Sequence, residues 1–203
     1  MTKESESRDR KRKIQETVPI RTIGIETERE NLDFQHRPPH RYAHVWFAAR
    51  PTPVSRLAVL ASVLPEDIDN DTLLNWMGFH PNNKPEGKSI SEHVREKRKT
   101  KDDRDGLEHE HYGYRKIWRY TPDVETKSQL HEVLKDTWGE LPTVLDATAG
   151  GGTIPLESIR YGLPTIANEL NPVPSVVLEA VLKKTRTQSD VSEDIIEWGE
   201  EID

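Results

Sequence analysis

With 203 residues, 33% hydrophobic and 32% charged, the chain can build one domain with an appendage, and poorly ordered polar segments are expected beside its core. The absence of cysteine excludes disulfides, thiolate zinc sites and a cysteine nucleophile; no apolar run nears the roughly 20 residues of a membrane helix and no signal peptide is seen, so a cytoplasmic location is expected. The net charge of -7 gives no global basic field for nucleic acid, so a DNA-binding surface must be local or lie beyond residue 203.

Three parts are expected along the chain. Residues 1–17 are strongly charged and predict a disordered, solvated tail. Residues 18–120 are interpreted as an N-terminal domain of unknown function, with short extended pieces over 18–45 and a polar loop near 97–110. Residues 121–203 are interpreted as the start of an α/β domain.

Helices are predicted in the middle of the N-terminal domain. Pro51 or Pro53 lies at the first position of one helix, whose apolar residues recur at helical spacing as far as Leu64. Two shorter helices are expected over 71–77 and 91–99.

From residue 121 the pattern alternates between helix and strand. The predicted elements are, in order, a helix over 124–138 ended by Gly139, a strand over 143–146, a helix over 154–161, a strand over 164–168, a helix over 175–184 and an amphipathic helix from Ser189. This order predicts a βα unit that feeds a parallel sheet.

A glycine-rich turn follows the first predicted strand and reads Asp-Ala-Thr-Ala-Gly-Gly-Gly-Thr over 146–153. Glycines let main-chain N–H groups approach a ligand without an intervening Cβ, and Thr153 is expected to cap the next helix. Such a turn lies at the carboxyl end of a parallel strand, where open α/β sheets bind ligands. Glu169 follows Asp146 by 23 positions (169 minus 146), just past the second strand, where an acidic residue accepts hydrogen bonds from ribose hydroxyls.

Other glycine-rich motifs fit less well. A P-loop needs Gly-Lys-Ser/Thr, and here Gly152 is followed by Thr153 and Ile154 without a lysine. A dinucleotide fingerprint needs Gly-x-Gly-x-x-Gly, and Pro155 stands where its last glycine belongs. A structural turn without a ligand is the remaining alternative.

Four segments resemble one family, the putative adenine-specific DNA methylases. Residues 146–157 resemble the family loop Asp-Pro-Phe-Ala-Gly-Gly-Gly-Ser/Thr-Ile-Pro-Leu-Glu, although Ala-Thr replaces Pro-Phe. Residues 45–52 resemble the Leu-Trp-Trp-Ala-Arg-Arg-Pro-Leu signature of its large members, which open with a domain of unknown function, but one arginine is missing. Residues 168–173 and 194–199 resemble Ser-Asp-Leu-Asn-Pro-Val and Asp-Val-x-x-Trp-Gly. The four matches keep the family's order over about residues 40–200.

The resemblance implies an incomplete Rossmann-like fold of an S-adenosyl-L-methionine-dependent methyltransferase, with a helical or irregular N-terminal region. It implies that the methionine end of the cofactor is lined by Asp146, Ala149, Gly150, Gly151, Gly152 and Thr153. Glu169 would bind the ribose, with Leu170 and Asn171 beside the adenine. Arg50 and Pro51 resemble a helix start that supports the methionine carboxylate, and a structural salt bridge is the alternative for Arg50.

The (Asp/Asn/Ser)-Pro-Pro-aromatic motif with which amino-methyltransferases hold a flipped base is absent, so no catalytic residue is assigned. Arg-Pro-Pro-His over 37–40 and Asn-Pro-Val over 171–173 are interpreted as structural turns. Only 57 residues follow Asp146 (203 minus 146), room for about two strands of a doubly wound sheet. The eight histidines show no metal-ligand spacing, so no metal is expected.

The expected function is therefore the cofactor-binding N-terminal portion of a DNA amino-methyltransferase, for adenine-N6 or cytosine-N4, inactive alone. Expected partners are DNA, through a missing C-terminal part, and in a split enzyme a second chain that carries the catalytic half. The alternatives are a non-catalytic module or remnant that pairs with a separate catalytic chain, and a fragment of an RNA or protein methyltransferase. The family context suggests restriction-modification or anti-phage defence.

Overall fold

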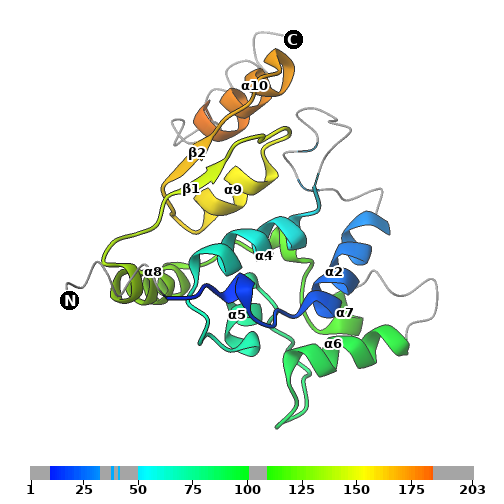
Figure 1. Cartoon of the computed structure of the whole chain (residues 1–203). Helices are drawn as coiled ribbons and strands as arrows, with labels where there is room; N and C mark the ends of the chain where they lie inside the picture. Colours follow the sequence, from blue (N-terminus) through cyan, green and yellow to red (C-terminus); the bar gives the residue numbers. More distant parts are fainter. Residues whose placement is uncertain (1–9, 33–37, 39–40, 42–49, 101–108, 185–203) are drawn as a thin grey trace, which may run out of the picture.

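The structure is a computed structural model that describes residues 10–32, 38, 41, 50–100 and 109–184. Helices dominate it, and two short strands form a parallel pair, which agrees with the α/β class at a coarse level (Figure 1). Its elements are η1 (Lys13–Gln15), α2 (Ile20–Leu32), α4 (Thr52–Val63), α5 (Asn70–Met77), α6 (Ile90–Lys99), α7 (His109–Tyr112), η2 (Ile117–Arg119), α8 (Val124–Trp138), β1 (Val144–Asp146), α9 (Thr153–Arg160), β2 (Thr165–Ala167), α10 (Pro172–Leu178) and η3, a π-helix (Glu179–Lys184).

Local signals set the bounds of the central helices. The side chains of Asp69, Ser89 and Asp123 each accept a hydrogen bond from the main-chain N–H three residues later, which caps α5, α6 and α8. Gly78 and Gly139 end α5 and α8 in the left-handed conformation that glycine adopts most readily. The helices predicted over 71–77, 91–99 and 124–138 are confirmed within a residue or two, as is α4 after Pro51.

The expectation of extended pieces over 18–45 is wrong for the stretch that forms α2. The buried face of this helix is mostly polar: Glu26, Arg29 and Glu30 are each no more than 2% exposed, beside Ile23. Hydrophobic periodicity therefore gave no sign of the helix, because charged side chains occupy positions that usually hold apolar ones. These buried charges are paired inside the protein. Nη1 of Arg29 lies 2.6 Å from Oε2 of Glu26, and Glu30 pairs with Arg41.

The described part of the expected N-terminal tail packs against the end of α4. The main-chain N–H of Lys13 donates to the Leu64 carbonyl at 2.8 Å, and the guanidinium of Arg12 lies 5.5 Å from the centre of the Trp138 ring. Lys13 is 6% exposed. Residues 10–17 are thus ordered through contacts with distant segments, which a local charge pattern does not encode.

One hydrophobic core runs across the expected boundary at residue 120. Leu60 of α4 and Leu64, which follows this helix, belong to the same buried cluster as Leu130 and Leu134 of α8, and Tyr161 joins it just after α9. The helical region and the start of the α/β unit therefore share their core, and α8 packs as a member of the helical layer.

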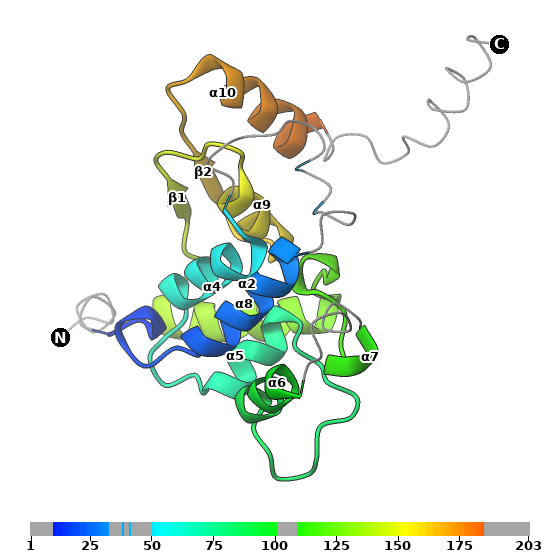
Figure 2. The ribbon, with the colours of Figure 1, turned by 90° about the vertical axis from the view of Figure 1, so that its right-hand side faces the viewer.

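The two strands and α9 make a single βαβ unit. In the described part of the chain, the sheet consists of these two strands. β1 and β2 pair in parallel, with Val144 opposite Thr165, Leu145 opposite Ile166 and Asp146 opposite Ala167. α9 contacts both strands and also α4, so it lies between the sheet and the helical layer, while α10 lies beyond the strands (Figure 2). The predicted strands, the helix between them and their parallel pairing are confirmed.

Apolar side chains on the sheet face away from α9 are exposed. Leu145 and Ile166, which are opposite each other, are 64% and 55% exposed. The helix expected over 175–184 begins earlier, at Pro172, and continues as the π-helix η3. Residues 45–49 and 194–199, the helix expected from Ser189 and most of the polar loop near 97–110 lie outside the described residues. In the described segments, no helix combines the length and apolar character required to cross a membrane.

Candidate functional site

The glycine-rich turn leaves the carboxyl end of β1 at Asp146 and enters α9. Gly150 has a φ of 49° and Gly152 a φ of 80°, a region that residues with a Cβ rarely adopt. The N–H of Gly152 donates to the Ala149 carbonyl at 2.8 Å, which closes the turn. A Cβ on Gly152 would also lie 2.7 Å from Cδ2 of Leu178, so α10 packs against the turn there.

The expected capping role of Thr153 is wrong. The N-cap of α9 is Gly152, which supplies no side-chain hydrogen bond, and Thr153 is the first residue of the helix with only 4% of its surface exposed. The left-handed φ of Gly152 moves the helix start one residue earlier than the residue types suggest.

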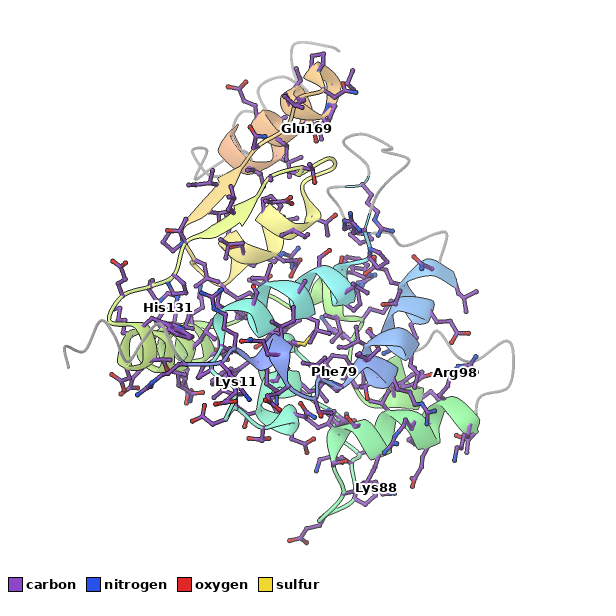
Figure 3. The ribbon with its side chains drawn as sticks, in the orientation of Figure 1. Lys11, Phe79, Lys88, Arg98, His131 and Glu169 are labelled. Carbon is purple, nitrogen blue, oxygen red and sulfur yellow. The ribbon has the colours of Figure 1, made fainter. Side chains whose placement is uncertain are left out.

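Glu169 is tied to the turn by its carboxylate. Oε2 accepts the N–H of Gly150 at 2.8 Å and Oε1 accepts the N–H of Asn171 at 3.0 Å. These two hydrogen bonds favour the charged form and lower the pKa of Glu169. Figure 3 shows Glu169 near α10, on the side of the molecule away from Lys88 and Arg98. Glu169 and the turn, which the sequence analysis assigns to one site, are therefore in direct contact.

The end of β2 holds the rest of the turn. Asn168 donates its main-chain N–H to the Asp146 carbonyl at 2.8 Å and its side-chain amide to the Ala147 carbonyl at 3.0 Å. The Asn168 carbonyl accepts the N–H of Ala149 at 3.0 Å. The turn is therefore fixed from both strands.

Two carboxylates and an exposed apolar side chain stand at this edge. Asp146 Oδ1 accepts the N–H of Thr148 at 3.2 Å, and within the described residues its Oδ2 accepts no hydrogen bond. Leu170, next to Glu169, is 94% exposed. Such a site attracts a cation or a hydroxyl donor and repels a phosphate.

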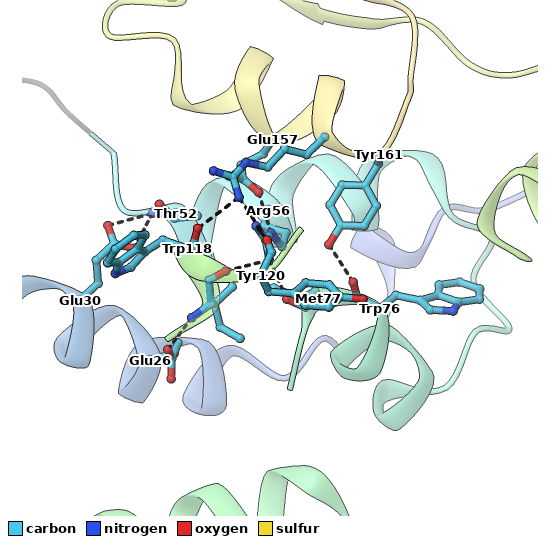
Figure 4. A network of polar contacts seen from close by, with 12 residues as sticks. Glu26, Glu30, Thr52, Arg56, Trp76, Met77, Trp118, Tyr120, Glu157 and Tyr161 are labelled. Carbon is cyan, nitrogen blue, oxygen red and sulfur yellow. Dashed lines mark hydrogen bonds and ion pairs between the residues drawn. The ribbon is translucent and has the colours of Figure 1, made fainter. Parts of the chain in front are cut away.

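Arg50 and Pro51 stand at the start of α4, as expected, but the carboxylate that this helix end binds comes from the chain itself. The N–H of Thr52 lies 3.1 and 3.2 Å from the two oxygens of Glu30 (Figure 4). Arg41 lies 2.8 Å from Glu30 and also donates to the Arg50 carbonyl at 3.0 Å. Burial raises the pKa of Glu30, and the Arg41 charge opposes this shift. The side chain of Arg50 is exposed.

The Asn-Pro-Val segment is a structural turn, as predicted. Oδ1 of Asn171 accepts the N–H of Val173 at 3.0 Å and caps α10, with Pro172 at its first position. Of the Arg-Pro-Pro-His segment, only Pro38 is described, and its carbonyl accepts the N–H of Arg41 at 2.9 Å. Among the described side chains, no group of three or more histidines and carboxylates is placed to hold a metal ion.

A buried charge pair that the sequence pattern does not reveal lies behind the turn. Arg56 of α4 and Glu157 of α9 are both 0% exposed, and Arg56 Nε lies 2.6 Å from Glu157 Oε2 (Figure 4). Glu157 ends the quoted loop motif, but nothing in its local pattern indicates a partner 101 positions away.

A scan against protein-family models, a search of curated proteins and a search of solved structures each gave no match for this chain.

Proposed function

We propose that the turn over 146–153 and Glu169 bind S-adenosyl-L-methionine. The observation that carries the proposal is the meeting of the Gly150 N–H and the Glu169 carboxylate at the carboxyl ends of two paired parallel strands. Open α/β sheets bind nucleoside-containing ligands at this edge.

The residues present fit the chemistry of this cofactor. Its sulfonium and ammonium groups are cationic, and Asp146 offers them a partly buried carboxylate whose Oδ2 is not engaged within the described residues. Each oxygen of Glu169 already accepts one main-chain N–H, and a carboxylate oxygen has a second lone pair with which to accept a ribose hydroxyl. The exposed Leu170 supplies an apolar surface for a planar base.

The same charges argue against a phosphate ligand. Phosphate-binding turns place main-chain N–H groups and a lysine around an anion. Here the N–H of Gly150 points to a carboxylate, a second carboxylate stands at Asp146, and the turn carries no lysine. A nucleotide phosphate would therefore be repelled at this edge.

We further propose that the chain is the cofactor-binding portion of a DNA amino-methyltransferase, for adenine-N6 or cytosine-N4. The support is the resemblance of residues 146–157 and 168–173 to the methylase segments, which lie on the turn and around Glu169. S-adenosyl-L-methionine would supply the methyl group. In this chain Asp146 and Glu169 would bind and orient the cofactor, and the turn would hold their spacing.

A second observation supports the proposal that this chain works together with another polypeptide. The exposed face with Leu145 and Ile166 leaves apolar surface in water, and a sheet of two strands, as the described residues form it, is marginal without added strands or covering helices. A second chain that carries the catalytic half would extend the sheet and cover this face.

Titration calorimetry of the full chain with S-adenosyl-L-methionine tests the proposal. We expect binding, weakened about tenfold or more in Asp146→Asn and in Glu169→Gln, and unchanged in Glu132→Ala, an exposed acidic residue of α8. No binding at millimolar cofactor by the folded chain would overturn the cofactor site.

A separate experiment tests the proposal that the chain binds the cofactor but does not transfer the methyl group by itself. Incubation of the chain with DNA and S-adenosyl-L-methionine should give no methylated base, because the chain lacks the Pro-Pro-aromatic motif. Methyl transfer by this chain alone would contradict the cofactor-binding-portion assignment while leaving the cofactor site intact.

A further inference from the structure

We infer that Arg56 and Glu157 are positioning residues for the glycine-rich turn: their buried ion pair fixes α9, and through α9 the main-chain N–H groups of the turn. This inference deepens the proposed function and rests on it for the identity of the ligand. Arg56 belongs to the helical region, which is far from the turn in sequence, so this region would also help to shape the site.

Arg56 is held from every side. Its Nη1 donates to the carbonyls of Met77 and Ile117 at 2.8 and 3.0 Å, and its Nη2 donates to the Tyr120 carbonyl at 3.0 Å. Its Nε is left for Glu157 at 2.6 Å. The planar guanidinium thus has one orientation, set by carbonyls on two segments of the helical layer, and it presents a fixed donor to α9 (Figure 4).

Glu157 depends on Arg56 more than the reverse. Its second oxygen, Oε1, is buried without a hydrogen bond, and Nε of Arg160, three residues later on α9, lies 3.4 Å from it. The hydrogen bond from Arg56 is therefore the contact that fixes the side chain. A buried carboxylate that lost this donor would have to move toward another donor or toward water.

A movement of Glu157 reaches the turn because α9 is short and stiff. Glu157 lies four residues, about 6 Å along the axis, after Thr153, the first residue of α9. The carbonyl of Gly152 accepts the N–H of Leu156 at 2.9 Å, so the turn is hydrogen-bonded to the residue just before Glu157. The helix that carries the anchor is thus the helix into which the turn opens.

The chain offers a matched control for a merely stabilising pair. Glu26 and Arg29 on α2 are 1% and 2% exposed and lie 2.6 Å apart, as close as Arg56 and Glu157. Both lie on one helix outside the βαβ unit. Because Glu26 Oε1 also accepts the N–H of Ile117, whose carbonyl binds Arg56, the control variant changes Arg29 and keeps the Glu26 carboxylate. Arg29→Lys should lower stability without altering the turn.

Hydrogen exchange on the ligand-free chain is the first measurement. In Glu157→Gln and in Arg56→Lys, the main-chain amides over 147–153 should exchange at least about threefold faster than in the native chain, at a temperature where all variants are folded. Arg29→Lys should leave these amides unchanged. The double variant R56M/E157L, which replaces the pair by apolar side chains, keeps the test informative if a single variant does not fold. Unchanged exchange over 147–153 in every folded variant of the pair would overturn the inference.

Cofactor affinity is the second measurement. S-adenosyl-L-methionine should bind Glu157→Gln about tenfold more weakly than the native chain, and should bind Arg29→Lys as the native chain does. If the native chain binds no cofactor while exchange over 147–153 still responds to Glu157→Gln, the proposed ligand is wrong and the positioning role stands. If the native chain binds the cofactor and Glu157→Gln binds it equally well, although exchange over 147–153 is faster in this variant, the positioning role does not extend to the ligand.

Discussion

The carboxylate of Glu169 accepts the main-chain N–H of Gly150 at 2.8 Å, although one residue follows β2 and the other follows β1. The same carboxylate accepts the N–H of Asn171, so one side chain fixes two turns at once. The acidic residue that the sequence assigns to ribose binding is therefore also a structural part of the turn, and its protonation should affect the turn before any ligand is added.

The first prediction concerns pH. Hydrogen bonds from Asn171 and Gly150 hold the pKa of Glu169 below its ordinary 4.5. Because the folded-state pKa is depressed, the stabilisation of the turn is complete above pH 4.5 and is lost as the pH falls through the lower, folded-state pKa. The amide resonance of Gly150, followed by NMR, should titrate with a midpoint below 4.5, and Glu169→Gln should abolish this titration. A midpoint at or above 4.5 would show that the contact does not persist in solution.

Substitution of glycine by alanine should have opposite effects on stability at Gly152 and at Gly24. Gly152→Ala places a Cβ at a φ of 80° and 2.7 Å from Leu178, so it should lower the free energy of unfolding by about 1–3 kcal/mol. Gly24→Ala lies inside α2 with nothing within 4 Å of the new Cβ, so it should raise that free energy by about 0.5–1 kcal/mol. Urea denaturation measures both. Equal effects would mean that the turn tolerates a side chain.

Leu170 separates binding from folding. Because it is 94% exposed, Leu170→Ala should change the free energy of unfolding by less than about 0.5 kcal/mol. Removal of the leucine side chain from its contact with the adenine ring should weaken S-adenosyl-L-methionine binding by about 1 kcal/mol, roughly fivefold in Kd. Val124→Ala, at a 77% exposed position of α8, is the matched control and should change neither quantity. An unchanged Kd in Leu170→Ala would remove Leu170 from the site.

What the sequence predicts well is set by local chemistry. Asp123 and Gly139 bound α8 because a carboxylate caps the first N–H groups and a glycine accepts the left-handed turn, and both signals are legible in a few residues. The turn after Asp146 and its pairing with Glu169 follow from the order of strand, helix and strand, which brings the carboxyl ends of parallel strands together.

What the sequence hides is long-range polar pairing. α2 buries Glu26 and Arg29, and α4 buries Arg56, so charged residues take positions that pattern reading assigns to solvent. Each is compensated by a partner that only the fold brings near, such as Glu157 for Arg56. The cap of α9 was missed for a related reason: the left-handed φ of Gly152 is a property of the folded turn.

The last prediction concerns the hydrogen bond that anchors the end of α9 to α5. Tyr161 is 0% exposed, and its hydroxyl donates to the Trp76 carbonyl at 2.7 Å. Tyr161→Phe removes this donor without changing the ring, so the free energy of unfolding should fall by about 1–2 kcal/mol, a decrease of several degrees in Tm. Tyr120→Phe is the control, because the Tyr120 hydroxyl lies 3.4 Å from Oγ1 of Thr126 and makes at best a weak hydrogen bond. The control should stay within about 0.5 kcal/mol of the native chain. Equal losses in the two variants would mean that the buried hydroxyl of Tyr161 contributes no more to stability than the weakly bonded hydroxyl of Tyr120.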